Sequence, residues 1–252
     1  MREPEAPRPA RASDRPRPAP TLPADLAAEL RRTITGTAYA RERAVKTLTR
    51  AAAAYDRHRF EEAARLAREV ADLAPEVAAV RELAGLAAYR AERYPAARAH
   101  LRAHFEITGD PEHLPLVMDA ERAAHHWRSV ERVFGELSAA GPAPDTLSEG
   151  RIVQAGAWAD QRRYREAIAL LEKSGAQRRM RHPAERHVRQ WYALADLYDR
   201  VGDATSAREL FSRVLAADPD AYDVRARLAE LGVGAARTRR ARPVSTKRDP
   251  SA

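Results

Sequence analysis

The residues with the clearest potential for chemistry in this sequence are histidines. His100 and His104 lie four residues apart, a spacing that on one helix presents two imidazoles to a single metal ion. A zinc site would need a further carboxylate or imidazole from elsewhere, and the chain has no His-Glu-x-x-His motif. His125 and His126 are adjacent in sequence and therefore point apart. We predict solvated helix histidines and no bound metal.

The motifs of other catalytic chemistry are absent from the sequence. The chain has no cysteine, which excludes disulfides, thiolate metal sites and a cysteine nucleophile. It has neither a Gly-x-Ser-x-Gly nucleophile elbow nor a Walker-type phosphate loop. Gly232 and Gly234 precede a basic tail and predict a helix end rather than a dinucleotide loop. We expect no catalytic residue, no cofactor and no enzymatic activity, although catalytic groups can converge without a motif.

Basic residues and prolines concentrate at the two ends of the chain. Residues 1–23 hold seven of the 17 prolines, and residues 235–252 carry six bases against one acid. Both ends lack the apolar side chains that offset the entropy of folding, so we predict disordered tails at 1–23 and 234–252. The segment between them, 24–233, has nearly balanced charge and is rich in the helix formers Ala, Leu, Arg and Glu.

The composition limits what the charge and the location can mean. Only three of the 44 basic residues are lysines and there is no asparagine, a bias typical of GC-rich codons that weakens any interpretation of single arginines. No apolar run reaches the 18 residues of a membrane span, and the N-terminus lacks the apolar core of a secretory signal. We therefore expect a cytoplasmic protein with no membrane partner.

The elements that would position any site form a repeat, which is clearest at 188–221. Its helical faces carry Trp191, Leu194, Ala195 and Tyr198, followed by Gly202, Ala207, Phe211 and Pro219. The small Ala195 and Ala207 allow two helices to approach closely, and the proline ends the second helix. This pattern resembles the tetratricopeptide repeat (TPR), with alanine in place of the small glycine. The resemblance implies an all-α, right-handed solenoid of helix hairpins.

The same register recurs upstream, at 44–77, 78–110, 111–144 and 148–187. An aromatic residue enters each second helix, and successive aromatics are 34, 33 and 37 residues apart, close to the TPR period. These aromatic residues are Phe60, Tyr94, Trp127 and Tyr164. An alanine-rich bundle shares the helical period but not the repeat period. We predict about five TPR hairpins, flanked by a short helix at 24–32 and a capping helix at 221–231. The layout also resembles small TPR proteins of high-GC Gram-positive bacteria, which implies no activity.

The TPR resemblance also implies a concave groove lined by the first helix of each hairpin. Tyrosine and arginine, which are enriched at binding hot spots, occur at several of the lining positions. The predicted partner site consists of Tyr55, Leu86, Tyr89, Arg90, Asp119, Arg122, Ile152, Arg189, Tyr192 and Asp196. Tyr55 and Tyr89 could instead pack between neighbouring repeats. A lysine–asparagine clamp for a terminal carboxylate is not expected, because the chain has no asparagine.

Two functions remain open from the sequence. The first is a non-catalytic adaptor that binds a peptide or helix of another protein in the groove. The second is a nucleic-acid- or ribosome-associated factor that makes weak phosphate contacts through its arginine-rich tails. The balanced charge of 24–233 argues against a nucleic-acid-binding groove and favours the first.

Overall fold

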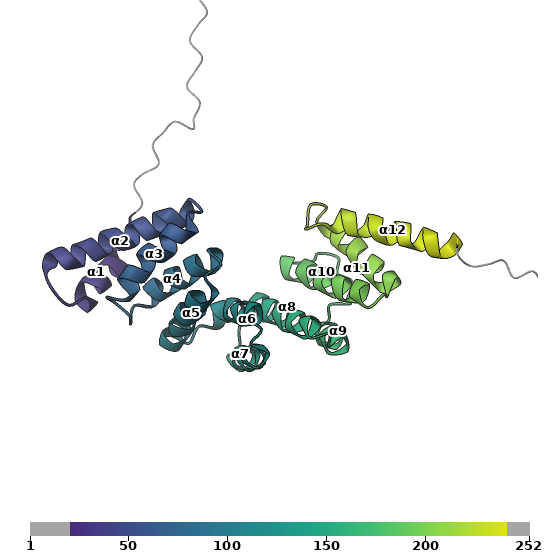
Figure 1. The fold of residues 1–252 in the computed structure, drawn as a ribbon, viewed down its shortest axis with the longest axis horizontal. Helices are drawn as coiled ribbons and strands as arrows, with labels where there is room; N and C mark the ends of the chain where they lie inside the picture. Colours follow the sequence, from purple (N-terminus) through teal and green to yellow (C-terminus); the bar gives the residue numbers. More distant parts are fainter. Residues whose placement is uncertain (1–20, 241–252) are drawn as a thin grey trace, which may run out of the picture. The chain divides into compact units, whose positions relative to one another are not determined.

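The computed structural model describes residues 21–240, which form helices joined by short connections (Figure 1). No strand occurs in this described range, so the predicted all-α class is confirmed. The helices are α1 (Ala24–Thr33), α2 (Ala38–Asp56), α3 (Phe60–Ala71), α4 (Ala78–Arg90), α5 (Tyr94–Thr108), α6 (Leu114–Ala123), α7 (Trp127–Ala139), α8 (Pro144–Asp160), α9 (Tyr164–Lys173), α10 (Glu185–Arg200), α11 (Ala204–Ala217) and α12 (Val224–Arg240), with a 3-10 turn, η1 (Pro111–His113).

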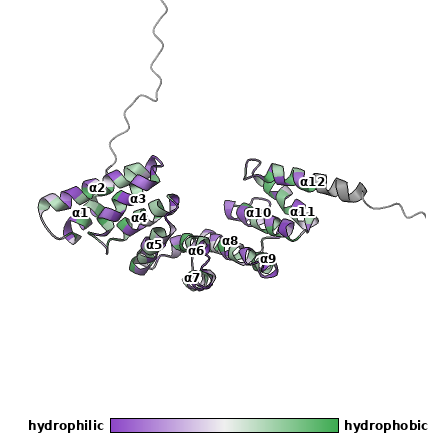
Figure 2. Cartoon of the chain, in the orientation of Figure 1, coloured by the Kyte–Doolittle hydropathy of each residue, from purple (hydrophilic) through white to green (hydrophobic). Residues whose placement is uncertain are grey.

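The chain divides into two compact units, Met1–Glu92 and Arg93–Ala252, which we call the N-terminal unit and the C-terminal unit. The N-terminal unit contains α1 to α4, and the C-terminal unit contains α5 to α12. Figure 2 shows hydrophobic and hydrophilic residues interleaved along the helices, as expected when one face of each helix is buried. The predicted repeat 78–110 supplies α4 to the first unit and α5 to the second.

The N-terminal unit is held together by aliphatic side chains and alanines. α2 begins after Thr37, whose hydroxyl accepts a hydrogen bond from the backbone N–H of Ala40 and so caps the helix. Leu48 on α2 and Leu66 on α3 are at most 2% exposed, and Val80 on α4 is fully buried. Buried alanines such as Ala51, Ala67 and Ala84 lie between these helices, and their small side chains allow the helices to pack closely.

The core of the C-terminal unit contains the residues that define the repeat. Leu194, Ala195, Ala207 and Phe211 are fully buried between α10 and α11, as the sequence pattern predicts. Tyr198 packs beside them and donates its hydroxyl hydrogen bond to Glu172 on α9. Partial burial and this carboxylate raise the pKa of Tyr198 to about 12.

The turn inside each hairpin contains one residue in the left-handed region, two positions before the second helix begins. The φ angles at these positions lie between 57° and 84°. The residues are His58, Glu92, His125, Arg162 and Gly202. Their spacing follows that of the aromatic residues that enter the second helices, so the backbone repeats with the same register as the sequence pattern.

The predicted limits of the last helix are wrong at both ends. Tyr222 lies in the preceding turn with φ +52°, so α12 begins at Val224 rather than at residue 221. At its other end α12 continues through Gly232 and Gly234 to Arg240. A glycine inside a helix costs only about 1 kcal/mol, and helix-forming alanines and arginines follow. The rest of the predicted tails, 1–20 and 241–252, lies outside the described residues.

Candidate functional site

The first helices of the C-terminal unit are connected by arginine–carboxylate pairs. Arg122 on α6 donates from Nε to Asp160 on α8 at 2.7 Å. Glu149 on α8 accepts from Nη1 of Arg189 on α10 at 2.9 Å. Asp196 on α10 in turn accepts from Arg227 on α12 at 2.9 Å. These side chains are partly exposed, and they belong to a surface that we call the first-helix strip. The strip consists of residues on α6, α8, α10, the turn before α12 and the start of α12: Asp119, Arg122, Glu149, Ile152, Asp160, Arg189, Tyr192, Asp196, Tyr222 and Arg227.

Arg122 lies directly on the backbone of α8 at a glycine. A Cβ atom at Gly156 would come within 2.7 Å of Nη1 of Arg122, so any larger residue would displace the guanidinium group. Asp119, one turn before Arg122, places a carboxylate oxygen 3.8 Å from the same group. The predicted site residues Asp119 and Arg122 therefore converge with Asp160 over Gly156. An isolated glycine inside a helical pattern was the sequence signal for this close approach.

Tyr192 anchors the end of the strip on α10. Its ring packs edge-on against Phe211 at 5.5 Å and lies 4.3 Å from the ring of Tyr222, measured between centroids. The Tyr192 hydroxyl donates to the carboxylate of Asp223. Burial and this hydrogen bond raise the pKa of Tyr192 well above its ordinary value. Tyr222 is 57% exposed, and the sequence analysis missed it as a partner of Tyr192 because it placed this residue in a capping helix.

The remaining predicted residues of this unit occupy the same strip. Arg189 bridges Glu149 to Glu185, and Asp196 accepts from Arg200 as well as Arg227. Ile152 on α8 is half-buried and supplies apolar surface. The strip thus combines apolar and aromatic surface with ionised groups that already satisfy one another.

In the N-terminal unit two of the predicted residues, Tyr55 and Arg90, contact Phe60, the first residue of α3. Tyr55 meets the Phe60 ring edge-on at 5.3 Å, and the Arg90 guanidinium carbon lies 4.4 Å from its centroid, a cation–π distance. Tyr55 also packs against buried alanines of α2, α3 and α4. These contacts favour the packing role for Tyr55. Leu86 and Tyr89 are half-buried on α4, and their part in binding stays a prediction.

The structure corrects the expectation for the histidine pair. His100 and His104 are each only 8% exposed on α5, so they are buried rather than solvated. The His104 ring lies 5.5 Å from that of His113 in η1. Within residues 21–240 no group of three His, Cys, Asp or Glu side chains is arranged to hold a metal ion.

Comparison with known proteins supports the repeat class. Residues 188–231 match the sequence profile of the tetratricopeptide repeat family. The structure is similar to that of TTC0263, a thermophilic TPR protein of Thermus thermophilus, with TM-score 0.57 and 16% identity over 75% of this chain and 99% of that one. At that identity the likeness shows the fold alone, and it confirms the predicted class of TPR helix hairpins.

A weaker similarity joins this chain to YrrB, described as a TPR protein with an unusual peptide-binding site. The TM-score is 0.47 and the identity 14%, over 77% of this chain and 92% of that one. No curated protein matches the sequence. None of the helices in the described part of the chain has the length and apolar character needed to traverse a bilayer.

Proposed function

We propose that this protein is a non-catalytic interaction scaffold that binds a segment of another protein along the first-helix strip. The observation that carries the proposal is the convergence of predicted site residues from α6, α8 and α10 into one strip of half-exposed tyrosine, arginine and isoleucine. Arginine and tyrosine are the side chains that most often dominate binding energy at interfaces. A solenoid built of TPR hairpins uses such extended surfaces for recognition rather than for covalent chemistry.

The ion pairs of the strip also fit a binding surface. Arg122, Arg189 and Asp196 are each already fixed by a partner, so a bound segment finds them ordered and loses less entropy in fixing them. All three side chains are partly exposed, so a bound peptide can contact them without unfolding the surrounding helices. Tyr192 and Tyr222 add apolar ring surface at one end of the strip.

Photo-crosslinking tests the proposal. A benzoylphenylalanine residue placed at Ile152 should crosslink a partner protein from the native cell extract. The same residue at Tyr39, which is 78% exposed and lies on α2 outside the strip, should not. Tyr192→Ala should weaken capture of that partner about thirtyfold, as expected for a hot-spot tyrosine. Tyr192→Phe keeps the ring and should retain most of the binding.

Two results would contradict this function. The first is equal crosslinking of the same protein from positions 152 and 39. The second is undiminished capture by Tyr192→Ala together with Arg189→Glu in a variant that circular dichroism shows to be folded. The alternative role in nucleic-acid binding rests on the basic tails alone, and residues 241–252 lie outside the described structure.

A further inference from the structure

A cleft separate from the first-helix strip lies between α11 and the link that joins α9 to α10. The link spans residues 174–184, longer than the connections inside the hairpins, and it runs over one face of α11. The cleft has a volume of about 700 Å³. Its lining comes from the link, from Trp191 on α10 and from the face of α11 that runs from Thr205 to Ala217. We call it the link cleft, and none of the predicted groove residues lines it.

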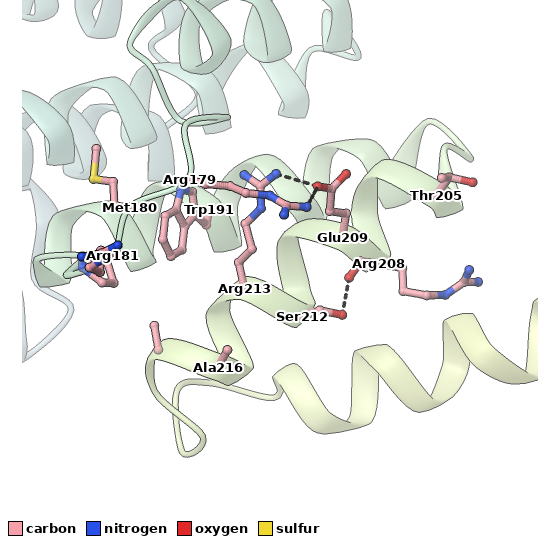
Figure 3. A pocket seen from close by; sticks show the side chains of 12 residues that line it. Arg179, Met180, Arg181, Trp191, Thr205, Arg208, Glu209, Ser212, Arg213 and Ala216 are labelled. Atoms are coloured by element: carbon pink, nitrogen blue, oxygen red, sulfur yellow. Dashed lines mark hydrogen bonds and ion pairs between the residues drawn. The ribbon is translucent and has the colours of Figure 1, made fainter.

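One part of the link cleft is apolar. Met180 is 38% exposed, although a thioether side chain gains nothing from water. Met180 lines the same cleft as Trp191, which is 3% exposed (Figure 3). Pro183 and Ala216 extend this surface. An aliphatic or aromatic side chain of a ligand would bury Met180 here and remove apolar area from water.

The rest of the cleft is strongly cationic. Four arginines line it against a single carboxylate, that of Glu209. Arg179 and Arg213 both donate to Glu209, at 2.8 and 2.7 Å (Figure 3). The two guanidinium groups hold the pKa of Glu209 below its usual range, so it stays ionised and neutralises only part of their charge. The cleft therefore keeps an excess of positive charge beside its apolar surface.

The Arg213 guanidinium is rigidly placed and only partly satisfied. Its Nη1 donates to the carbonyl oxygen of Gln177 in the link at 2.6 Å. Its Nε is enclosed yet has no hydrogen-bond partner within the described part of the chain. The Arg208 side chain extends away from Met180 and Trp191 (Figure 3) and donates to the carbonyl oxygen of Leu231 at 3.0 Å. Arg179 and Arg213 are therefore the guanidinium groups fixed near the apolar surface. Pre-positioned guanidinium groups beside an apolar wall suit a ligand that carries carboxylates and a hydrophobic side chain.

We propose that the link cleft binds an acidic segment of a partner protein, with an apolar side chain seated against Met180 and Trp191. The lining of α11 runs from Thr205 to Ala217, about 18 Å of helix, which matches an extended segment of about five residues. The proposal rests on the scaffold function proposed above and adds to it the charge of a partner and a second contact surface.

The charge and burial of the cleft argue for this occupant over two others. The chain's own C-terminal residues 235–252 carry six bases and one acid, so the arginines would repel them. A single-stranded nucleic acid needs exposed aromatic faces on which bases stack, and Trp191 is only 3% exposed. An acidic peptide is attracted by the arginines and does not need an exposed aromatic face.

Fluorescence anisotropy with a defined probe tests the proposal. The probe is a fluorescein-labelled peptide, Gly-Asp-Glu-Leu-Phe-Glu-Asp-Gly, titrated with the full chain. We expect it to bind, and a peptide with Asn and Gln in place of the acids to bind at least about tenfold more weakly. Arg179→Ala combined with Arg181→Ala should weaken binding of the acidic peptide about tenfold, and Met180→Glu should do the same. Arg178→Ala, one residue away and outside the lining, is the matched control and should leave binding within about twofold.

Four outcomes would overturn the proposal. The first two are that the acidic peptide does not bind at 1 mM and that the neutral peptide binds equally well. The third is that a twelve-nucleotide oligothymidylate displaces the labelled peptide at a lower concentration than the unlabelled acidic peptide does. The fourth is that Tyr192→Ala weakens peptide binding while the link variants do not. Because Arg179 is 79% exposed, its truncation should not unfold the protein, which circular dichroism verifies. If the crosslinks from Ile152 persist while the link variants bind the peptide normally, the scaffold function stands and this inference alone fails.

Discussion

The two units of the molecule bury different kinds of side chain. Within residues 21–92, the described part of the N-terminal unit, no polar side chain is buried. The C-terminal unit buries several, and connects its first helices by arginine–carboxylate pairs. These buried polar residues are His100, His104, Glu121, Ser148, Gln154 and Gln190. Both units have an apolar core and ion pairs at the surface, and the C-terminal unit adds polar side chains that are buried in the core.

Two residues at the same repeat position illustrate how the contacts of the two units differ. Tyr55 and Arg122 both lie twelfth in their predicted repeats. Tyr55 packs on Phe60 within its own hairpin, whereas Arg122 reaches across to Asp160 on the next first helix. Packing of rings responds weakly to salt and pH, while partly exposed ion pairs respond to both. The N-terminal unit should therefore be sensitive to truncation, and the C-terminal unit to charge and to changes at its buried polar groups.

The largest effect is expected from a cavity in the N-terminal unit. Leu48 on α2 is 1% exposed, and Leu48→Ala should lower the free energy of unfolding by about 3 kcal/mol through lost burial and an unfilled cavity. Urea denaturation followed by circular dichroism measures the loss. Leu73→Ala is the control, because Leu73 is 54% exposed and should change stability by less than about 0.5 kcal/mol. Equal effects at the two leucines would refute the apolar core assigned to this unit.

A gain in stability is expected from the C-terminal unit. Gln154 is 1% exposed, and neither its Nε2 nor its Oε1 has a hydrogen-bond partner within the described residues. Leu194 holds the equivalent position in the last repeat, which shows that leucine fits such a site. Gln154→Leu should raise the free energy of unfolding by about 1–3 kcal/mol, because it removes two buried unpaired groups. The midpoint of urea denaturation reports the gain.

Gln161→Leu at the C-terminal end of the same helix provides the comparison for Gln154. Gln161 is only half-buried and donates to the carbonyl oxygen of Ala157, so its replacement should be neutral within about 0.5 kcal/mol. A loss of stability in Gln154→Leu would mean that the buried amide stabilises the unit, and that the polar core of this unit is fully satisfied.

Much of the fold could be predicted from the sequence because the repeat pattern records local packing. Ala195, Ala207 and Phe211 were predicted at the helix contact from their size and spacing alone, and all three are fully buried. The end of α12 could not be predicted, because glycine signals a helix end only when the residues beyond it do not favour a helix. Here Gly232 and Gly234 are followed by alanines and arginines, and the helix continues.

The candidate site was less predictable for a different physical reason. Spacing identifies which residues share the face of one helix, but it does not show which partner a long side chain reaches on another. The sequence placed Arg189 and Asp196 in a groove, yet it could not show that they pair with Glu149 and Arg227. The link cleft was likewise hidden, because it depends on the path of residues 174–184 over α11.

Acid should weaken the C-terminal unit through Glu136 on α7. Arg102 on α5 donates to this carboxylate and lowers its pKa from the ordinary value of 4.5. A pKa that is lower in the folded state gives stability above about pH 4.5, and that stability is lost as the pH falls through the lowered pKa. Glu136→Gln should cost about 0.5–1 kcal/mol at pH 7 and little at pH 3.

Denaturation curves at pH 7 and pH 3 measure this difference. Glu76→Gln provides the comparison in the N-terminal unit, since Glu76 is exposed, and it should change stability equally little at both pH values. An equal loss from Glu136→Gln at pH 7 and pH 3 would show that the Arg102 pair contributes nothing to the contrast between the units.

Effects of about 1 kcal/mol or less are also expected at the hairpin turn, the feature in which the two units do not differ. Arg162 in the C-terminal unit and His58 in the N-terminal unit both adopt φ near +60°, where a side chain costs about 1 kcal/mol or more. Arg162→Gly should stabilise the protein by about 0.5–1 kcal/mol, since glycine relieves this strain but loses more entropy on folding.

Gly202→Ala at the same repeat position should cost about 1 kcal/mol from the backbone alone, because a Cβ there meets no atom of the described chain within 4 Å. Thermal melting of both variants and of His58→Gly checks these signs. If His58→Gly and Arg162→Gly shift the melting temperature in opposite directions, the difference between the units extends to the turns, and backbone geometry can no longer be treated as common to the whole repeat array.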